Sequence, residues 1–169
     1  FAGVIAYTVF GGADFGSGLW DLTAGDAVKG ARLRTLIDHA IGPVWEANHI
    51  WLVFVLVYLW SAFPAAFAAL CETLYIPLSL AALGIVLRGS AFACRKFAAG
   101  MAQARLFGSV FAASSVLTPF MFGTVVGAVA SGGVPLDGGG DRWSSWTGPS
   151  SLVGGVLAVA TCAFLAAVF

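Results

Sequence analysis

Long apolar runs, separated by short polar connections, dominate this chain. Five of them are close to or above the roughly 20 residues that an α-helix needs to cross a hydrocarbon core. These runs cover about 1–20, 44–63, 73–92, 106–130 and 150–169. The pattern therefore predicts an all-α integral membrane protein, a helical bundle of about five transmembrane helices.

The connections between the runs predict how the spans are organised. The connection 64–72 is short, so the spans on either side of it are expected to form a tight antiparallel hairpin with Glu72 at its tip. The connection 131–149 is rich in Gly and Ser, which is typical of a flexible loop. We therefore expect a first four-helix membrane bundle over 1–130, then this loop, then a fifth span over 150–169.

Composition supports a membrane protein and excludes several other classes. Only 9% of the residues are charged and 60% are hydrophobic, whereas about a quarter of an ordinary soluble domain is charged. A net charge of zero gives no indication of nucleic-acid binding. The three cysteines, Cys71, Cys94 and Cys162, are far apart and lack Cys-x-x-Cys spacing, which indicates neither a disulfide framework nor a zinc site.

The positive charges predict the orientation of the chain in the membrane. Seven of the eight Lys and Arg residues lie in or beside the connections 21–43 and 93–105. Cytoplasmic connections carry an excess of Lys and Arg, so these two are expected on the cytoplasmic side. The start of the chain and the loop 131–149 are then expected to be extracytoplasmic.

Two pairs of glycines predict where helices approach one another closely. Gly12 and Gly16 in the first run, and Gly123 and Gly127 in the fourth, each leave a small-xxx-small face. Such faces let a neighbouring helix come near in a membrane. Close packing matters in the first run because Asp14 lies between the two glycines.

Three ionisable residues, Asp14, Glu46 and Arg88, lie inside predicted spans. A charged side chain at the centre of a bilayer costs about 2.5–3.5 kcal/mol on insertion scales and usually marks a polar pathway or a buried partner. Asp14 is about six residues, or roughly 9 Å, from the cytoplasmic end of its span near Trp20. The topology therefore places all three residues in one layer near the cytoplasmic leaflet.

The second predicted span begins with three polar residues close together. Glu46 and His49 share a helix face at i, i+3 spacing, while Asn48 points about 100° away from His49. These groups predict a polar layer that serves proton movement. The alternative for this layer is that Arg88 extends to the lipid headgroups and Glu46 lies at the water boundary, favoured there by the helix dipole.

A metal or haem held by this chain alone is not predicted. Glu46 and His49 have the Glu-x-x-His spacing of di-iron carboxylate bundles, but those sites need two such motifs and two further Glu residues. His39 lies in a connection and is expected at the surface. Any cofactor would therefore need ligands from another chain.

Four segments of the chain resemble subunit II of cytochrome bd-type quinol oxidases. The resemblance covers most of residues 1–130 and follows the family's order and spacing, whereas residues 131–169 match poorly. The segments are GGADFGSG (11–18), IGPVWEANHIWLV (41–53), AFPAAFAALCETLYIPL (62–78) and LRGSAFACRK (87–96).

Individual positions match the family pattern or depart from it. Trp45, Asn48 and Trp51 match the second segment, in which Glu46 replaces the usual Asp and Ala47 the usual Gly. In the first segment Asp14 matches the second acid of the pattern, whereas Gly11 replaces the first acid, so no role is carried over to that position.

The resemblance implies a function for the whole assembly. The chain would be one subunit of a prokaryotic respiratory membrane enzyme that oxidises quinol and reduces oxygen. Subunit I, its partner in a heterodimer, would carry the haems b and d and oxidise quinol near the outer face. A full family member has a second helical bundle, so this sequence is expected to represent the first half.

The resemblance also implies roles for particular residues. The acid at Glu46 would help to carry protons from the cytoplasm toward the oxygen-reducing haem, assisted by Asp14, Asn48 and His49. Arg88, Trp45 and Trp51 would act as structural or charge partners.

Two other functions fit the polar layer. A proton-coupled transporter would also place acids and glycines within helices, but transporter sites favour the bilayer midplane and broken helices. A purely structural membrane scaffold would use the polar groups only to hold helices together. Substitution of Glu46 by Gln separates these alternatives, because a scaffold keeps its hydrogen bonds whereas a proton relay loses turnover.

Overall fold

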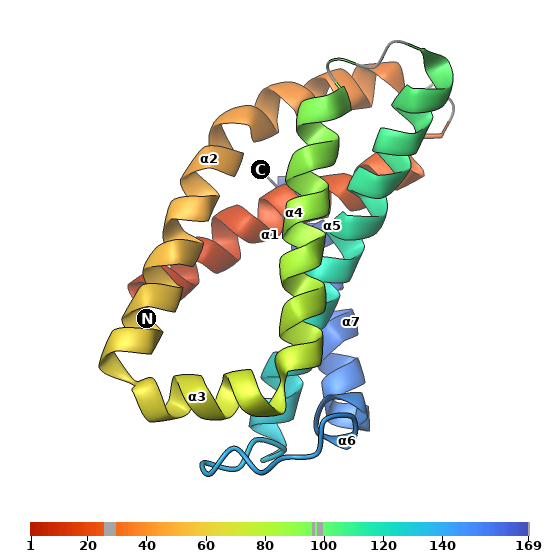
Figure 1. Ribbon diagram of the computed structural model, residues 1–169. Helices are drawn as coiled ribbons and strands as arrows, with labels where there is room; N and C mark the ends of the chain where they lie inside the picture. The colour runs from red at the N-terminus through yellow and green to blue at the C-terminus, as the bar shows by residue number, and fades with distance from the viewer. Residues whose placement is uncertain (26–29, 96, 98–99, 169) are drawn as a thin grey trace.

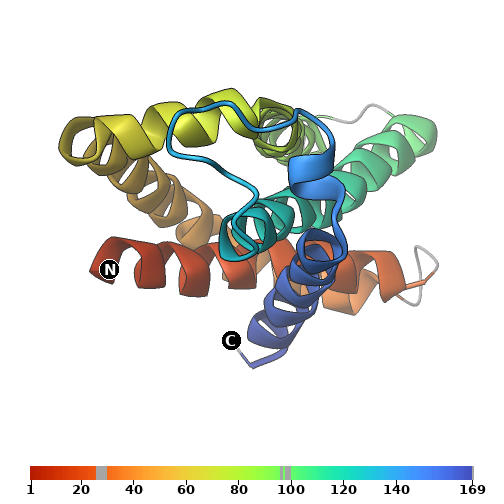
Figure 2. The ribbon, with the colours of Figure 1, turned by 90° about the horizontal axis from the view of Figure 1, so that it is seen from below.

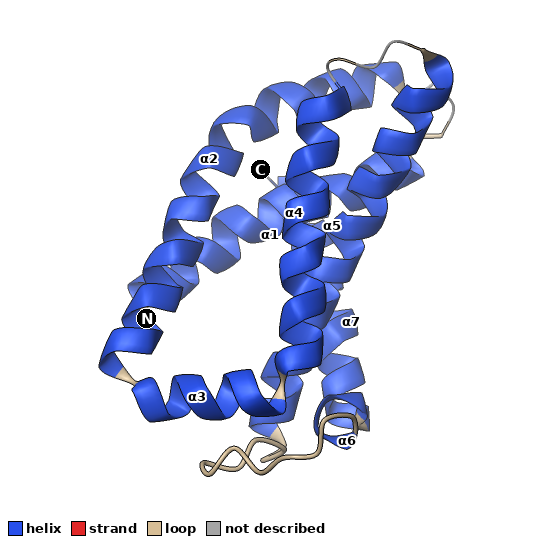
Figure 3. Ribbon diagram, viewed as in Figure 1, coloured by secondary structure: helices blue, strands red, loops and turns tan. Residues whose placement is uncertain are grey.

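The fold is entirely helical in the part of the chain that the structure describes (Figure 3), which confirms the predicted class. This computed structural model describes residues 1–25, 30–95, 97 and 100–168, and the side chains at 31, 38, 41–46, 95 and 101 lie outside the description. The helices are α1 (Ala2–Thr23), α2 (Ala31–Ala62), α3 (Pro64–Thr73), α4 (Tyr75–Arg95), α5 (Met101–Ala130), α6 (Ser144–Thr147) and α7 (Pro149–Val168).

Three of the described helices are long and apolar enough to cross a membrane by themselves. They are the stretches Tyr75–Cys94, Ala102–Ala130 and Pro149–Val168. A fourth span is added if the bent pair Ala47–Ala62 and Pro64–Thr73 crosses as one unit. Helix α1 occupies the first predicted run but is not among these spans; aspartates and many glycines lower its mean hydropathy.

The predicted tight hairpin between the second and third spans is wrong. Helix α3 turns by 113° from α2 and runs across to the base of α4, so α2 and α4 stand apart (Figure 1). The break occurs because Pro64 has no N–H for helix continuation and disfavours helical geometry at Phe63, whose φ and ψ are −133° and 58°. Glu72 therefore lies in the last turn of α3, beside Gly138, and not at a hairpin tip.

Helix α7 packs closely against both α1 and α5, as the two glycine pairs predict. A Cβ at Gly12 would meet the side chain of Leu165, and one at Gly16 would meet the backbone carbonyl of Cys162. Gly123 and Gly127 meet the backbone at the start of α7 in the same way. The small-xxx-small faces are confirmed: α5 packs against the first half of α7 and α1 against its second half (Figure 2).

The connection before α7 is anchored by one tryptophan. Trp146, on the short helix α6, is buried in an apolar cluster with Leu74, Met121 and residues around them. The carboxylate of Asp141 accepts hydrogen bonds from the backbone N–H of Ser144, at 2.7 Å, and of Trp143, at 2.9 Å, which lower its pKa. The connection predicted as a flexible loop thus ends in a packed helical turn.

The two ends of the bundle differ in what they carry. Helix α3, α6 and the connection 131–143 lie at one end, whereas the end of α4 and the starts of α2 and α5 lie at the other (Figure 1). The end of α4 and the start of α5, which belong to the connection 93–105, therefore lie on the same side as the start of α2, which belongs to the connection 21–43. The distribution of Lys and Arg predicts this common side.

Candidate functional site

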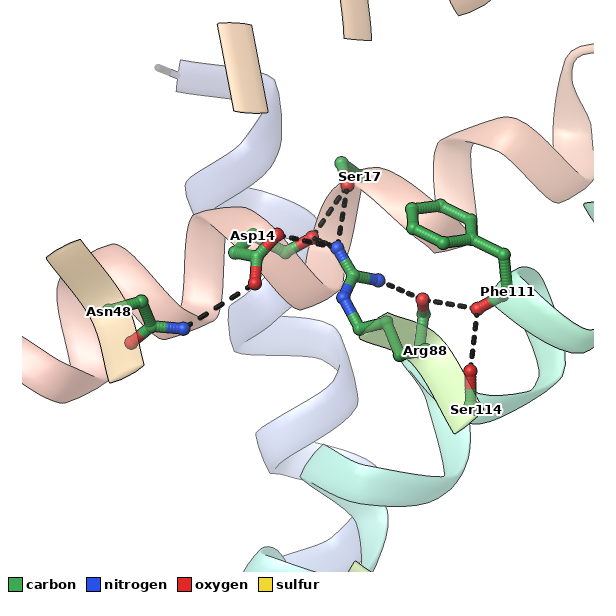
Figure 4. Close-up of polar contacts among 7 residues, drawn as sticks. Asp14, Ser17, Asn48, Arg88, Phe111 and Ser114 are labelled. Atoms are coloured by element: carbon green, nitrogen blue, oxygen red, sulfur yellow. Dashed lines mark hydrogen bonds and ion pairs between the residues drawn. The ribbon is translucent and has the colours of Figure 1, made fainter. Parts of the chain in front are cut away.

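A buried ion pair joins α1 to α4. The guanidinium Nη2 of Arg88 lies 2.6 Å from Oδ1 of Asp14, and the two side chains are 2% and 1% exposed (Figure 4). The same nitrogen donates to the backbone carbonyl of Asp14 at 2.6 Å. The alternative in which Arg88 extends to the lipid headgroups is therefore wrong, because its charge is held inside the bundle.

Glycines in α1 make room for this pair. At Gly18 a Cβ would collide with the side chain of Ser115 from α5 and would stand 3.2 Å from Nη1 of Arg88. On the opposite side of α1, Gly12 and Gly16 accept α7. Helix α1 is therefore enclosed by its neighbours around Asp14, which removes the carboxylate from water and leaves Arg88 as its counter-charge.

The remaining guanidinium surface is covered by α5 and by α1. Nη1 of Arg88 donates to Oγ of Ser115, which in turn donates to the backbone carbonyl of Phe111 at 2.5 Å. The aromatic rings of Phe111 and Phe15 lie 4.3 and 5.2 Å from Cζ of Arg88, within the range of cation–π attraction. Ser17 adds a long contact of 3.5 Å to Nη2.

Sequence reasoning missed these residues around the ion pair. A signal for Ser17 was present, because it follows Asp14 at i+3 on the same helix face. Ser114 and Ser115 were also visible as a polar pair within the apolar run 106–130. Nothing in the one-dimensional pattern, however, indicates that α5 brings them to Arg88.

Asn48 brings α2 into the same cluster. Its side chain is 2% exposed, and its amide nitrogen Nδ2 lies 3.5 Å from Oδ2 of Asp14. The Asp14 carboxylate thus accepts from Arg88 with one oxygen and faces Asn48 with the other (Figure 4). Four helices meet at this point: α1, α2, α4 and α5.

The other predicted site residues lie nearby on α2. His49 follows Asn48 directly and is half-buried. Trp51 makes an edge contact with the ring of Phe54, with centroids 6.2 Å apart. Glu46 and Trp45 belong to the α2 helix, but their side chains lie outside the described residues.

A second ion pair lies at the end of α1. Nε of Arg34 is 2.7 Å from Oδ1 of Asp21, and Nη2 of Arg34 donates to the backbone carbonyl of Gly25 at 2.9 Å. The Asp21 side chain is 5% exposed, but that of Arg34 is 25% exposed. This pair ties the end of α1 to the start of α2, where water reaches the guanidinium.

No cluster of metal ligands occurs in the described part of the chain. A group of three or more His, Cys, Asp or Glu side chains able to hold an ion is absent from those residues. The buried cluster consists instead of one carboxylate, one guanidinium, one amide and hydroxyl groups, a set suited to holding charge and orienting hydrogen bonds.

Comparison with known proteins gives one consistent result. A family model described as cytochrome bd terminal oxidase subunit II matches residues 1–169. The chain is 27% identical over 132 residues to the cytochrome bd ubiquinol oxidase subunit 2 of Bacillus subtilis (strain 168). It is also 29% identical over 85 residues to the putative cytochrome bd menaquinol oxidase subunit II of the same organism.

These alignments also define how much of each relative is represented. The first covers 76% of this chain and 39% of the relative, and the second covers 50% and 24%. The chain therefore corresponds to well under two thirds of the length of either protein. The family match also continues through residues 131–169, the stretch in which a poor match was expected.

Proposed function

Because the chain belongs to the cytochrome bd terminal oxidase subunit II family, we propose that it works as subunit II of a membrane-bound quinol oxidase. The assembled enzyme would transfer electrons from quinol to oxygen and form water. The chain would be a multi-pass cell-membrane subunit beside a haem-bearing subunit I, which carries the haems b and d. The connections 21–43 and 93–105 would face the cytoplasm.

The observation that carries the mechanistic part of this proposal is the buried polar cluster around Asp14. Reduction of oxygen to water consumes protons together with electrons, and protons cross an apolar region only through groups that exchange hydrogen bonds. Asp14 and Asn48 supply such groups inside the bundle, where they are nearly inaccessible to water. Intramembrane ionisable residues of this kind commonly mark ion or proton pathways.

Each residue of the proposed route has a distinct task. Glu46 is the carboxyl group that takes up and releases the proton on the cytoplasmic side of the bundle. His49, about one turn along α2, offers ring nitrogens that can donate or accept a hydrogen bond. Asn48 links α2 to the carboxylate of Asp14 by its amide group, and Arg88 holds that carboxylate in place by an ion pair.

The lipid-facing exterior supports assembly with a larger partner. Several large apolar side chains of α2 are more than half exposed, among them Ile50, Phe54 and Trp60. An exterior of this kind is suited to contact with lipid and with the apolar surface of subunit I. Asn48 on α2 would then lie between subunit I and the Asp14 cluster.

Substitution of Glu46 by Gln in the complete oxidase tests the route. We expect quinol-driven oxygen uptake to fall by about 10²-fold or more, because removal of a positioned proton-transfer group typically costs 10²–10⁴-fold. Glu72→Gln is the matched control, since Glu72 lies on α3 at the opposite end of the bundle. The haem spectrum of both variants establishes that the complex has assembled.

The outcome distinguishes the relay from the alternatives. A fully assembled Glu46→Gln oxidase with unchanged oxygen uptake would contradict the relay and favour the structural scaffold. A preparation purified with its natural partner but free of haem absorbance would contradict the oxidase assignment itself.

A further inference from the structure

Besides Nε of Arg88, two buried polar atoms near Asp14 make no hydrogen bond within the described residues. They are the hydroxyl oxygen of Tyr7 on α1 and the side-chain oxygen Oδ1 of Asn48 on α2. Each has an accessible area below 1 Å², so bulk water does not solvate it. A buried polar group without a partner costs about 1–3 kcal/mol, which makes two of them on adjacent helices a feature that needs an explanation.

The ring of Tyr7 and the amide oxygen of Asn48 both lie beside Gly11. A Cβ added at Gly11 would stand 2.9 Å from Oδ1 of Asn48 and 3.3 Å from Cε2 of the Tyr7 ring. Tyr7, Gly11 and Asp14 follow one another at i, i+4 and i+7, so they form one stripe on the helix. Gly11 therefore lets the Tyr7 ring and the Asn48 amide both lie against α1, where a side chain would push them away.

The amide of Asn48 has a defined orientation because of what lies on its two sides. Its nitrogen faces the Asp14 carboxylate, which accepts only, so its oxygen must face away from Asp14 (Figure 4). The oxygen needs a donor, and the Tyr7 hydroxyl is a donor without an acceptor among the described residues. The two needs are complementary, yet no direct bond joins them.

We propose that one or two ordered water molecules bind between the Tyr7 hydroxyl and Oδ1 of Asn48, beside Gly11. The water accepts from Tyr7 and donates to Asn48, so both orphan atoms gain a partner. Buried waters typically occupy polar sites of this kind and make about three hydrogen bonds. The site is distinct from the ion pair but is connected to it through the amide of Asn48.

This site makes Tyr7 a positioning residue for the Asp14 cluster. The water holds Asn48 with its nitrogen toward Asp14, and it extends the polar stripe along α1 by two turns, roughly 10 Å. The effect on turnover rests on the proposed function, whereas the water site does not. The two can therefore fail separately.

An experimental structure of the complete oxidase, at a resolution that shows ordered water, tests the site directly. We expect density within about 3.2 Å of both the Tyr7 hydroxyl and Oδ1 of Asn48. A direct Tyr7–Asn48 hydrogen bond, or hydrocarbon atoms filling the space beside Gly11, would overturn the proposal. This result is independent of the activity of the Glu46→Gln oxidase.

Tyr7→Phe in the complete oxidase tests the same site in solution, with Tyr58→Phe as the matched control. Tyr58 lies on α2 and is 57% exposed, so its hydroxyl has no part in the cluster. Infrared spectra in water and in ¹⁸O-labelled water should show a bound-water band that Tyr7→Phe removes and Tyr58→Phe retains. If both variants kept the band, or both lost it equally, the proposed water site would be contradicted.

The turnover of these variants tests the positioning role. Oxygen uptake should fall by about threefold to tenfold in Tyr7→Phe, the size expected when one hydrogen bond is lost, and stay unchanged in Tyr58→Phe. If the bound-water band disappears while uptake stays at the wild-type rate, the water site stands and the positioning role is overturned.

Discussion

The two ion pairs of α1 are almost identical in chemistry and differ in their surroundings. Arg88 binds Asp14 at 2.6 Å and Arg34 binds Asp21 at 2.7 Å, each through a guanidinium nitrogen and a carboxylate oxygen. The first pair is sealed between helices with both side chains at most 2% exposed, whereas Arg34 is 25% exposed. The distance between the charges therefore does not distinguish them, but their access to water does.

Burial changes what each pair contributes. In the interior neither charge can be solvated, so loss of one partner leaves the other uncompensated, and the whole cluster depends on both. At the end of α1 water reaches the Arg34 guanidinium but hardly the Asp21 carboxylate, so it compensates for a lost partner only in part. The Asp14 pair is thus an obligatory part of the bundle, while the Asp21 pair adds local order where α1 ends and α2 begins.

The largest expected effect is that of Arg88→Gln. Removal of the guanidinium leaves the Asp14 carboxylate buried without its counter-charge, which typically costs about 3–5 kcal/mol. We expect a loss of that size in the free energy of unfolding, measured by denaturant titration of the purified complex, together with a low yield of assembled oxidase.

The double variant Asp14→Asn, Arg88→Gln sharpens this prediction. Both charges are then absent, so the assembled yield and the free energy of unfolding should recover substantially toward the wild type. If the double variant were as unstable as Arg88→Gln alone, shape complementarity around Arg88 rather than charge compensation would be the main contribution.

The smallest expected effect is that of Arg34→Gln. The Arg34 side chain is 25% exposed but that of Asp21 only 5%, so the loss should lie between the about 0.2–1 kcal/mol of an exposed pair and the loss in Arg88→Gln, and salt screens part of it. Denaturant titration at low and high salt should show a loss in this range that shrinks as salt rises. A loss as large as that of Arg88→Gln would contradict the view that access to water separates the two pairs.

Much of the architecture could be predicted from the sequence because lipid imposes simple rules. Apolar runs of helical length predict the helices, and the glycine pairs predict two close approaches, both of which the structure gives to α7. The hairpin prediction failed at Pro64, where a short connection folded into a helix of its own. A count of connecting residues does not reveal whether they form a turn or a transverse helix.

The site could be predicted only in part, for a different reason. Depth within the spans correctly placed Asp14 and Arg88 in one layer, and the structure joins them in an ion pair. The partners from α5, Ser115 and Phe111, were not predictable because serines and phenylalanines are ordinary in membrane helices. Their role depends on which helix face meets Arg88, a property of packing and not of spacing.

Single-turnover proton uptake by the Glu46→Gln oxidase in vesicles is the decisive test of the proton route. Fully reduced enzyme is mixed with oxygen, and a pH indicator on the cytoplasmic side is followed together with haem absorbance. In the Glu46→Gln oxidase we expect electron transfer to begin at the wild-type rate and proton uptake to slow by about 10²-fold or more. Proton uptake at the wild-type rate in this variant would contradict the proton route.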